Sequence, residues 1–345
     1  MRRLLIMLFV AAAVLIAAFA GTGLWLRSEI DTPYYGGQEE GTFVEIPRGT
    51  NPGRAADLLV GSGILRTRLP FVLYIRYANL GRHLQAGEYR FSGPATPKQI
   101  AQRLVRGDVY SRTITIPEGL TAKETIELLA KQGLGNRQEL EETLLRRDWI
   151  RDLDPAARNL EGYLFPETYR FSRKADAETI VKTMVDQFRT RLARTMEANP
   201  LPPGWSISRI VILASMIEKE VKEPEEAPLV ASALVNRLDR KMPLGCDATI
   251  IYAMKLAGTY QGRLGKADMG MASPYNTYLH LNLPPGPICN PGAGSLRAAL
   301  RPAKTDYLYY VSRNDGTHQF SKDFNSHVRA VERYQKSLVR SRSRR

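Results

Sequence analysis

The 345-residue sequence is poor in the side chains that many hydrolases use for catalysis. Its four histidines include no pair with the spacing of the HExxH zinc motif, which argues against a metal hydrolase. It contains no GxSxG serine motif, and neither of its two cysteines has an obvious catalytic setting. We therefore expect no metal and no cofactor, and carboxylates remain as the candidates for acid/base chemistry.

Acidic residues are too few to balance the basic ones. The chain has 49 Lys and Arg against 35 Asp and Glu, which gives a net charge of +14 at pH 7. Such a surface can attract nucleic acid, anionic lipid or an anionic wall polymer. No aromatic–basic nucleic-acid motif is present, so the second and third partners are favoured. Part of the excess lies at the chain ends, in Arg2, Arg3, Arg340, Arg342, Arg344 and Arg345.

A single stretch, Leu4–Leu26, has 23 residues without a charge, enough to cross a bilayer as a helix. Arg2 and Arg3 precede it, so the positive-inside rule places the rest of the chain outside the cytoplasm. This predicts a single-pass protein of the inner (cytoplasmic) membrane. Ala18-Phe19-Ala20 resembles a signal-peptidase site, which leaves a cleaved signal peptide open. We expect a retained anchor, because the uncharged run continues past that site.

The two cysteines, Cys246 and Cys289, both lie in loop-like sequence of the C-terminal half. Outside the cytoplasm such a pair can oxidise, so one hypothesis is a disulfide that ties two loops together. Two unpaired small residues are the equally weighted alternative.

The expected fold class is α+β, and the length predicts about two domains. A polar linker is followed by a repeat, because the VEIPRG sequence at 44–49 is matched 70 residues later by ITIPEG at 114–119. Each copy predicts a short strand, a Pro-Gly turn and an amphipathic helix. The predicted parts are a stub and anchor (1–27), a linker (28–42), two small α/β modules (43–110 and 111–155), a mainly helical domain (156–338) and a basic tail (339–345).

Hydrophobic periodicity places most of the remaining elements. From Pro243 onward we expect turns and short segments, a loop-rich C-terminal part. Glu161–Phe171 is interpreted as a loop or short strand. Strands are predicted at Leu84–Phe91 and Leu308–Val311, and helices at Thr96–Val105, Thr121–Gln132, Arg137–Arg147, Ala175–Asn199, Glu226–Arg237 and His327–Ser337.

A further predicted helix, which begins near Ser206, carries a carboxylate on its apolar side. Glu218 falls on the same helical stripe as Val211, Ala214 and Val221. Partial desolvation disfavours a charged carboxylate, which suits a general acid. A glutamate that reaches solvent from the helix end is the alternative interpretation. Other carboxylate candidates are Glu161, Glu167, Glu220, Glu226 and Asp247.

Carboxylates are the usual groups for cleaving a glycosidic bond. The turn at 273–278 offers Tyr275, Asn276, Thr277 and Tyr278, which could line a sugar cleft by stacking and hydrogen bonding. A structural loop packed by its own tyrosines is the alternative for this turn.

Several long stretches together resemble the endolytic murein transglycosylases of the MltG (YceG-like) family. The resemblance covers nearly the whole chain, from about Val44 to the last helix. The stretches that carry it are LQAGEY at 84–89, ITIPEG at 114–119, EGYLFPETY at 161–169, LASMIEKE at 213–220, VASALVNRL at 230–238, SPYNTY at 273–278 and LPPGPI at 283–288.

The resemblance implies a membrane-anchored enzyme that faces the cell wall, with LysM-like modules ahead of a catalytic domain at 156–338. It places the catalytic glutamate at the first Glu of the EKE triplet, Glu218. Asn282, Cys246 and Cys289 depart from the family pattern, in which glycine, small or hydroxyl residues are commoner. Residues implied to bind substrate or support the cleft are Glu220, Glu226, Asn236, Arg237, Asp247, Tyr275, Asn276, Thr277, Glu161 and Tyr163.

The mechanism that the resemblance implies needs one carboxyl group. Protonated Glu218 would donate to the oxygen that links N-acetylmuramic acid to N-acetylglucosamine, and would then accept the proton of the muramic acid C6 hydroxyl as it closes a 1,6-anhydro ring. A hydrolytic muramidase and a wall-binding scaffold without cleavage are the alternatives. The expected partners are peptidoglycan strands, the membrane and wall-synthesis enzymes, although no residue identifies such an enzyme.

Overall fold

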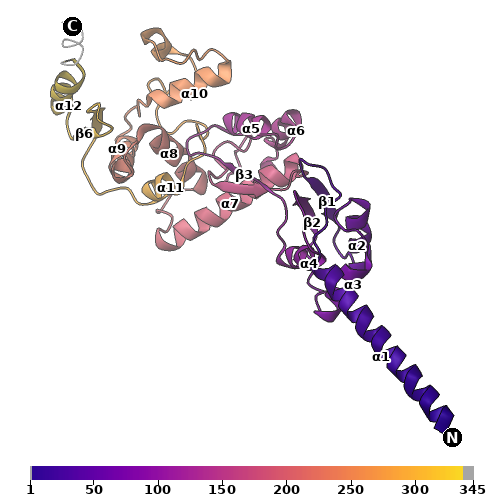
Figure 1. Ribbon diagram of the computed structural model, residues 1–345. Helices are drawn as coiled ribbons and strands as arrows, with labels where there is room; N and C mark the ends of the chain where they lie inside the picture. Colours follow the sequence, from indigo (N-terminus) through magenta and orange to yellow (C-terminus); the bar gives the residue numbers. More distant parts are fainter. Residues whose placement is uncertain (1, 337–345) are drawn as a thin grey trace. The chain divides into compact units, whose positions relative to one another are not determined.

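The computed structural model describes residues 2–336. The chain divides into two compact units, one that ends at Arg112 and one that begins at Thr113. Each unit has its own cluster of buried hydrophobic residues. Helices are joined to small two-stranded sheets in both units, so the mixed helix and strand content expected from the sequence is confirmed (Figure 1).

Unit 1 begins with helix α1, Arg2–Asp31. Its segment Ile6–Asp31 is long and apolar enough to cross a membrane, and the large apolar side chains from Ile6 to Trp25 are exposed. An exposed apolar helix of this length is compatible with the predicted single-pass anchor.

The rest of unit 1 is a two-stranded sheet packed against three helices. The strands are antiparallel, with Thr42 opposite Phe91 and Ile46 opposite Gly87. Helix α4 begins with a capping box, in which Thr96 and Gln99 satisfy each other's backbone N–H groups, and it ends at a left-handed Gly107. The elements are β1 (Thr42–Ile46), α2 (Pro52–Gly61), α3 (Leu69–Tyr77), β2 (Gly87–Phe91) and α4 (Pro97–Arg106).

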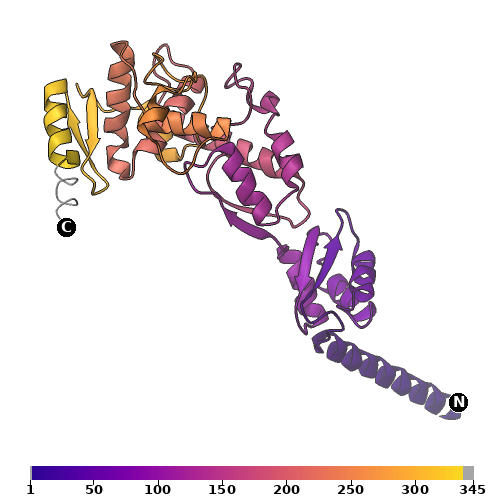
Figure 2. The same cartoon turned by 90° about the horizontal axis from the view of Figure 1, so that it is seen from above.

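Unit 2 is mainly helical. Its sheets are the pair β3 and β4 and the antiparallel hairpin β5–β6, which packs beside α12 (Figure 2). The elements are β3 (Arg112–Thr115), α5 (Ala122–Lys131), α6 (Arg137–Thr143), η1 (Arg147–Ile150), β4 (Thr168–Phe171), α7 (Ala177–Ala198), α8 (Ile207–Glu220), η2 (Pro224–Glu226), α9 (Ala227–Asp239), α10 (Asp247–Ala257), η3 (Lys266–Gly270), α11 (Ala293–Leu300), β5 (Tyr309–Ser312), β6 (His318–Ser321), α12 (Phe324–Val331) and the π-helical turn η4 (Glu332–Lys336).

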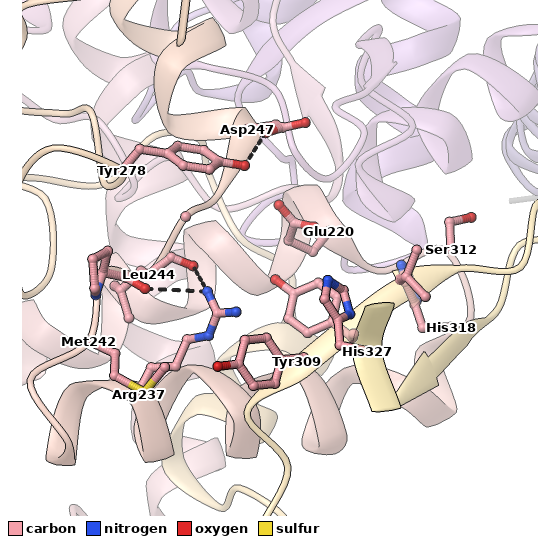
Figure 3. A pocket seen from close by; sticks show the side chains of 14 residues that line it. Glu220, Arg237, Met242, Leu244, Asp247, Tyr278, Tyr309, Ser312, His318 and His327 are labelled. Atoms are coloured by element: carbon pink, nitrogen blue, oxygen red, sulfur yellow. Dashed lines mark hydrogen bonds between the residues drawn. The ribbon is translucent and has the colours of Figure 1, made fainter. Parts of the chain in front are cut away.

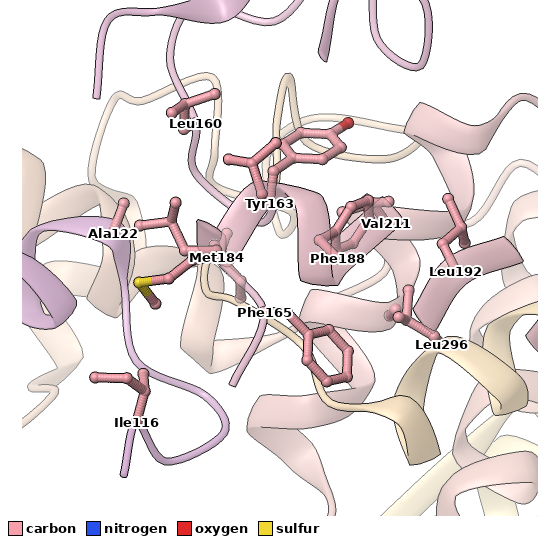
Figure 4. Close-up of a cluster of buried hydrophobic side chains, with 14 of the residues drawn as sticks. Ile116, Ala122, Leu160, Tyr163, Phe165, Met184, Phe188, Leu192, Val211 and Leu296 are labelled. Atoms are coloured by element: carbon pink, nitrogen blue, oxygen red, sulfur yellow. The ribbon is translucent and has the colours of Figure 1, made fainter. Parts of the chain in front are cut away.

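Helix α8 lies at the centre of unit 2. Every residue from Ile210 to Ile217 is buried, and the helix packs against α9, α10 and α11. Figure 4 shows part of the surrounding cluster, in which Val211 lies near Phe188 of α7. A helix that is buried on all sides is fixed in position by packing, so its C-terminal end is a rigid support for functional side chains.

The sequence repeat corresponds to a repeat of local structure. Strands β1 and β3 begin 70 residues apart, and so do helices α2 and α5. In both copies a side chain, Asn51 or Thr121, accepts a hydrogen bond from the backbone N–H three residues later. The predicted strand–turn–helix pattern is therefore confirmed in both copies. The buried residues of the second copy, such as Ile116 and Ile126, belong to the same core as α8.

The C-terminal region differs from the expected run of turns and short segments. It contains the helices α10 and α11. Helix α10 is apolar on most of its surface, which hides the 3.6-residue period, although Asp247 in its first turn and the left-handed Gly258 after its end are helix signals. The last helix begins at Phe324, three residues before the predicted start, because Asp323 caps it. Residue 337 and the predicted tail at 339–345 lie outside the described residues.

The buried side chain of Asn290 joins three loops that surround α8. Its Oδ1 accepts hydrogen bonds from the backbone N–H groups of Gly162 and Leu164, each at 3.0 Å, and its Nδ2 donates to the Leu120 carbonyl at 3.0 Å. Gly162 has a φ of 87°, and a Cβ there would lie 2.5 Å from the Pro287 ring. Only glycine lets the backbone at position 162 come this close to Pro287, so glycine here allows the EGYLFPETY and LPPGPI stretches to pack together.

We predict that Asn290→Ala destabilises unit 2 strongly. The substitution leaves the buried backbone N–H groups of Gly162 and Leu164 without their acceptor, and each such group costs roughly 1–3 kcal/mol, whereas the Leu120 carbonyl keeps its bond from the backbone N–H of residue 290. Urea unfolding followed by the fluorescence of Trp149 and Trp205, both in unit 2, measures the loss. Asn325→Ala at an exposed position of α12 is the control, and we expect it to change the free energy of unfolding by less than about 0.5 kcal/mol. Equal effects of the two substitutions would contradict the role of Asn290.

Candidate active site

Three cavities on unit 2 share lining residues, and together they are called the groove below. The first has a volume of about 500 Å³ and the second about 310 Å³, and Glu220 and Asp247 line both of them. The third has a volume of about 260 Å³ and shares Thr121, Lys255 and Tyr260 with the second. Glu220 and Asp247 therefore lie where the first and second cavities adjoin.

Glu220 is the last residue of α8, and its side chain enters the first cavity (Figure 3). The Cys246 thiol donates a hydrogen bond to its Oε1 at 2.9 Å. Burial raises the pKa of Glu220, and the charge of Asp247 raises it further, whereas the bond from Cys246 opposes the increase. This environment disfavours the charged form of the carboxyl group.

Asp247 is the first residue of α10 and lines the same two cavities as Glu220. The Tyr278 hydroxyl donates to its Oδ1 at 2.6 Å (Figure 3). The backbone N–H of Cys246 donates to Thr277 Oγ1 at 3.0 Å, so the 273–278 turn fixes the start of α10. Asn276, which is fully buried, donates to the carbonyls of Met269 and Met271 and thus holds this turn in shape.

Glu218 points away from the groove. Successive residues of a helix are about 100° apart, so side chains two residues apart point in roughly opposite directions. Glu218 Oε2 accepts a hydrogen bond from the backbone N–H of Gly292, just before α11, at 2.9 Å. It lies close to Glu118 of the ITIPEG turn, whose pKa is raised by desolvation and by the Glu218 charge. Glu218 is not among the residues that line the three cavities.

Three predicted residues at the two ends of α9 connect that helix to the hairpin β5–β6. Arg237 lines the first cavity, and it donates to the carbonyls of Leu308 at 2.6 Å and Leu244 at 2.7 Å. Asn236 donates to two carbonyls in the segment that leads into β5. Glu226 binds His318 of β6 through the backbone N–H at 2.9 Å and the ring Nδ1 at 2.7 Å. These contacts position one wall of the groove.

Glu161 and its neighbours lie at the other end of the groove. Glu161 lines the third cavity, and its two oxygens accept hydrogen bonds from the Ala122 N–H at 2.8 Å and the Tyr252 hydroxyl at 3.1 Å. Burial raises its pKa to about 7. Tyr275 packs against the Tyr252 ring, with centroids 4.9 Å apart. Tyr163 is fully buried, and its hydroxyl donates to Asp154 Oδ2 at 2.9 Å.

The predicted disulfide is not formed. Cys246 and Cys289 are both free and buried, and they have different partners. Cys246 faces Glu220, whereas Cys289 donates to the Ser215 carbonyl inside the core at 3.3 Å. Burial raises the pKa of both thiols well above the ordinary value, so each stays protonated at neutral pH. The alternative of two unpaired residues is therefore correct.

The sequence interpretation missed several residues that line the groove. Tyr309 and His327 line the first cavity and stack on each other, with ring centroids 5.1 Å apart. Lys255 and Tyr260 connect the second and third cavities. Lys255 was missed because α10 was not recognised as a helix, and His327 because only metal spacing was considered. Within residues 2–336, no group of three or more His, Cys, Asp or Glu side chains is placed to hold a metal ion.

The chain belongs to the YceG-like family, whose model matches residues 44–333. This confirms the resemblance seen in the sequence. One relative, named endolytic murein transglycosylase, is from Bacillus subtilis (strain 168); it is 32% identical over 307 residues, which cover 84% of each chain. A relative of the same name from Streptococcus pneumoniae serotype 2 is 27% identical over 332 residues, which cover 84% of this chain and 57% of the relative.

A solved structure of a YceG-like protein from Listeria monocytogenes also resembles this chain. It has a TM-score of 0.56 and 29% sequence identity, and the match covers 85% of this chain and 99% of that one. The fold is thus shared with a member of the same family.

We predict that Glu161→Gln flattens the dependence of stability on pH. Because the pKa of Glu161 rises from 4.5 to about 7 on folding, its contribution is fully present below pH 4.5 and is lost as the pH rises to about 7. The loss is roughly 3 kcal/mol at most. The amide of Gln is always neutral and can still accept from the Ala122 N–H.

Urea unfolding between pH 4.5 and 8 measures this difference. Glu197→Gln, an exposed substitution on α7, should keep the pH dependence of the wild type. Parallel curves for wild type and Glu161→Gln would show that Glu161 does not titrate in this range.

Proposed function

We propose that this protein is an endolytic murein transglycosylase that cleaves the bond between N-acetylmuramic acid and N-acetylglucosamine within peptidoglycan strands. Relatives that align over 84% of the chain have this name. The observation that carries the proposal is the pair Glu220 and Asp247, which lines two adjoining cavities of the groove, the second of which shares residues with a third. A groove of this kind accommodates a polymer on both sides of the cleaved bond, which an endolytic enzyme requires.

We further propose Glu220 as the catalytic acid, in place of Glu218, the residue predicted from the sequence. Glu220 lines two of the cavities, and burial raises its pKa. Glu218 accepts a backbone N–H at the start of α11 and faces the ITIPEG turn. A general acid must reach the glycosidic oxygen, so the position in the groove favours Glu220.

In the proposed mechanism one carboxyl group first donates and then accepts a proton. Protonated Glu220 donates to the glycosidic oxygen as the bond from C1 of the muramic acid breaks. The resulting carboxylate takes the proton of the C6 hydroxyl, whose oxygen attacks C1 and closes the 1,6-anhydro ring. The nucleophile belongs to the substrate, so its effective concentration is high and no activated water is needed.

Asp247 supports a second candidate, a hydrolytic muramidase. It places a second carboxylate beside Glu220, and inverting and retaining glycosidases use such a pair to activate water or form a covalent intermediate. In the transglycosylase the charge of Asp247 instead favours the protonated form of Glu220. The two reactions leave different chain ends, so the product distinguishes them.

The decisive experiment compares Glu220→Gln with Glu218→Gln, which differ by two positions on one helix. Each full-length variant is incubated with purified peptidoglycan, and new chain ends are identified by mass spectrometry. We expect anhydro-muramic ends from the wild type, a loss of about 100-fold or more in Glu220→Gln, and retained cleavage in Glu218→Gln.

Other outcomes have distinct meanings. If only Glu218→Gln lost cleavage, with a circular dichroism spectrum like that of the wild type, Glu218 would be the catalytic acid. New reducing ends would identify a hydrolase. Wall binding without any new ends from the wild type would identify a scaffold.

We predict that Cys246→Ala shifts the pH profile of cleavage. The thiol bond to Glu220 opposes the increase in its pKa, so its removal raises that pKa further. The protonated acid then persists to higher pH, and the alkaline limb of kcat/KM moves upward. Cys246→Ser keeps a hydrogen-bond donor and should return the alkaline limb to its wild-type position. Cys289→Ala removes a thiol that donates to Ser215 and should leave the limb unchanged. An unchanged limb in Cys246→Ala would contradict this role.

The proposed location is the inner membrane, with both folded units on the extracytoplasmic side. Helix α1 supports a single-pass anchor, and the basic residues at its start support this orientation. Peptidoglycan lies on that side of the membrane. Partnership with peptidoglycan synthases is expected for such an enzyme, but no residue of this chain specifies one.

A further inference from the structure

Helix α3 of unit 1, Leu69–Tyr77, has an apolar surface that the unit covers only in part. Its sequence, LPFVLYIRY, is apolar except for Arg76; Pro70, Phe71 and Ile75 are buried, and residues 72–74 are half-buried. Leu69 is 49% exposed and Tyr77 is 92% exposed. A helix that is apolar all round is normally buried, so the exposed side of α3 calls for a partner.

Helix α3 lies next to the anchor. Helix α1 packs against α3 and α4 within unit 1 (Figure 1). Among the described side chains of α1, those that the unit partly covers are Leu26, Glu29 and Ile30, close to its C-terminal end. The contact with α3 is therefore at the level where the apolar segment of α1 ends, which in a membrane is the interface with the lipid headgroups.

Exposed arginines border the same helix. Arg66 and Arg68 precede α3, Arg76 lies in its last turn, and Arg82 follows it. Arg68 forms an ion pair with Asp57, with 3.4 Å between nitrogen and oxygen, and both side chains are exposed. Such a surface pair is weak, so the arginine remains available to other anions. Arginines around an apolar and aromatic centre are the composition of a surface that binds anionic bilayers.

We propose that this α3 patch, formed by Leu69, Tyr77, Arg66, Arg68, Arg76 and Arg82, rests on the surface of an anionic lipid bilayer. The proposal rests on α1 crossing that bilayer and is independent of the catalytic activity. A second copy of the chain is a poorer occupant, because its own arginines would repel those of the patch. The bilayer complements both the charge and the apolar centre.

The test uses the full-length protein in vesicles, with an environment-sensitive fluorophore on Tyr77→Cys. The native cysteines are buried, so the new thiol is labelled selectively. The control position is Arg48→Cys, an exposed residue in the turn after β1. In vesicles that contain phosphatidylglycerol, we expect a blue-shifted emission at position 77, quenched by lipid-attached nitroxide at least about twofold more than at position 48.

Charge variants separate the patch from a general electrostatic effect. Arg66→Gln with Arg68→Gln should reduce the quenching at position 77, as should vesicles of pure phosphatidylcholine. Arg48→Gln with Arg54→Gln removes the same charge elsewhere in unit 1 and should leave the quenching unchanged. Equal quenching at positions 77 and 48 in all vesicles would overturn the proposal. A blue shift that persists in detergent and grows with protein concentration would also overturn it, in favour of a second copy.

Discussion

The fold of unit 2 depends on one buried amide. Asn290 satisfies backbone groups from the segment after the ITIPEG turn and from the EGYLFPETY loop, and it lies two residues before Gly292, where α11 is about to begin. Three segments that are distant in sequence are thereby held around α8. Because α8 is also buried on all sides, the direction of its last side chains is set by the core and not by the solvent.

This constraint explains why Glu218 and Glu220 differ. Periodicity identifies the stripe of a helix that faces the core, and Glu218 lies on that stripe, where it meets the N–H of Gly292. The proposed catalytic group, Glu220, faces the cavity, whereas the apolar stripe that made Glu218 prominent in the sequence directs that side chain toward Gly292. The pKa of Glu220, off the stripe, is raised by burial among residues that are distant in sequence, which no local pattern shows.

The sequence predicted elements with local signals well. Helices α4, α5 and α8 have capping residues, α4 and α5 also have a clear apolar stripe, and the repeat placed β1 and β3. Helix α10 was missed because it is apolar on several sides. The groove could not be predicted, since its walls depend on pairings across the chain, such as Glu226 with His318, 92 residues apart. The disulfide hypothesis was wrong for the same reason, because the sequence does not give the distance between two cysteines. In the structure the Cys246 thiol donates a hydrogen bond to Glu220.

The two copies of the sequence repeat have different structural roles. The first copy has its core inside unit 1, and its turn exposes Arg48 to solvent. In the second copy the equivalent position is Glu118, whose carboxyl packs against Gly292 beside Glu218, and whose neighbouring helix shares the core of α8. The first copy thus contributes to the core of unit 1 alone. The second is built into the core around α8, so a substitution in its turn has to fit the residues around that helix.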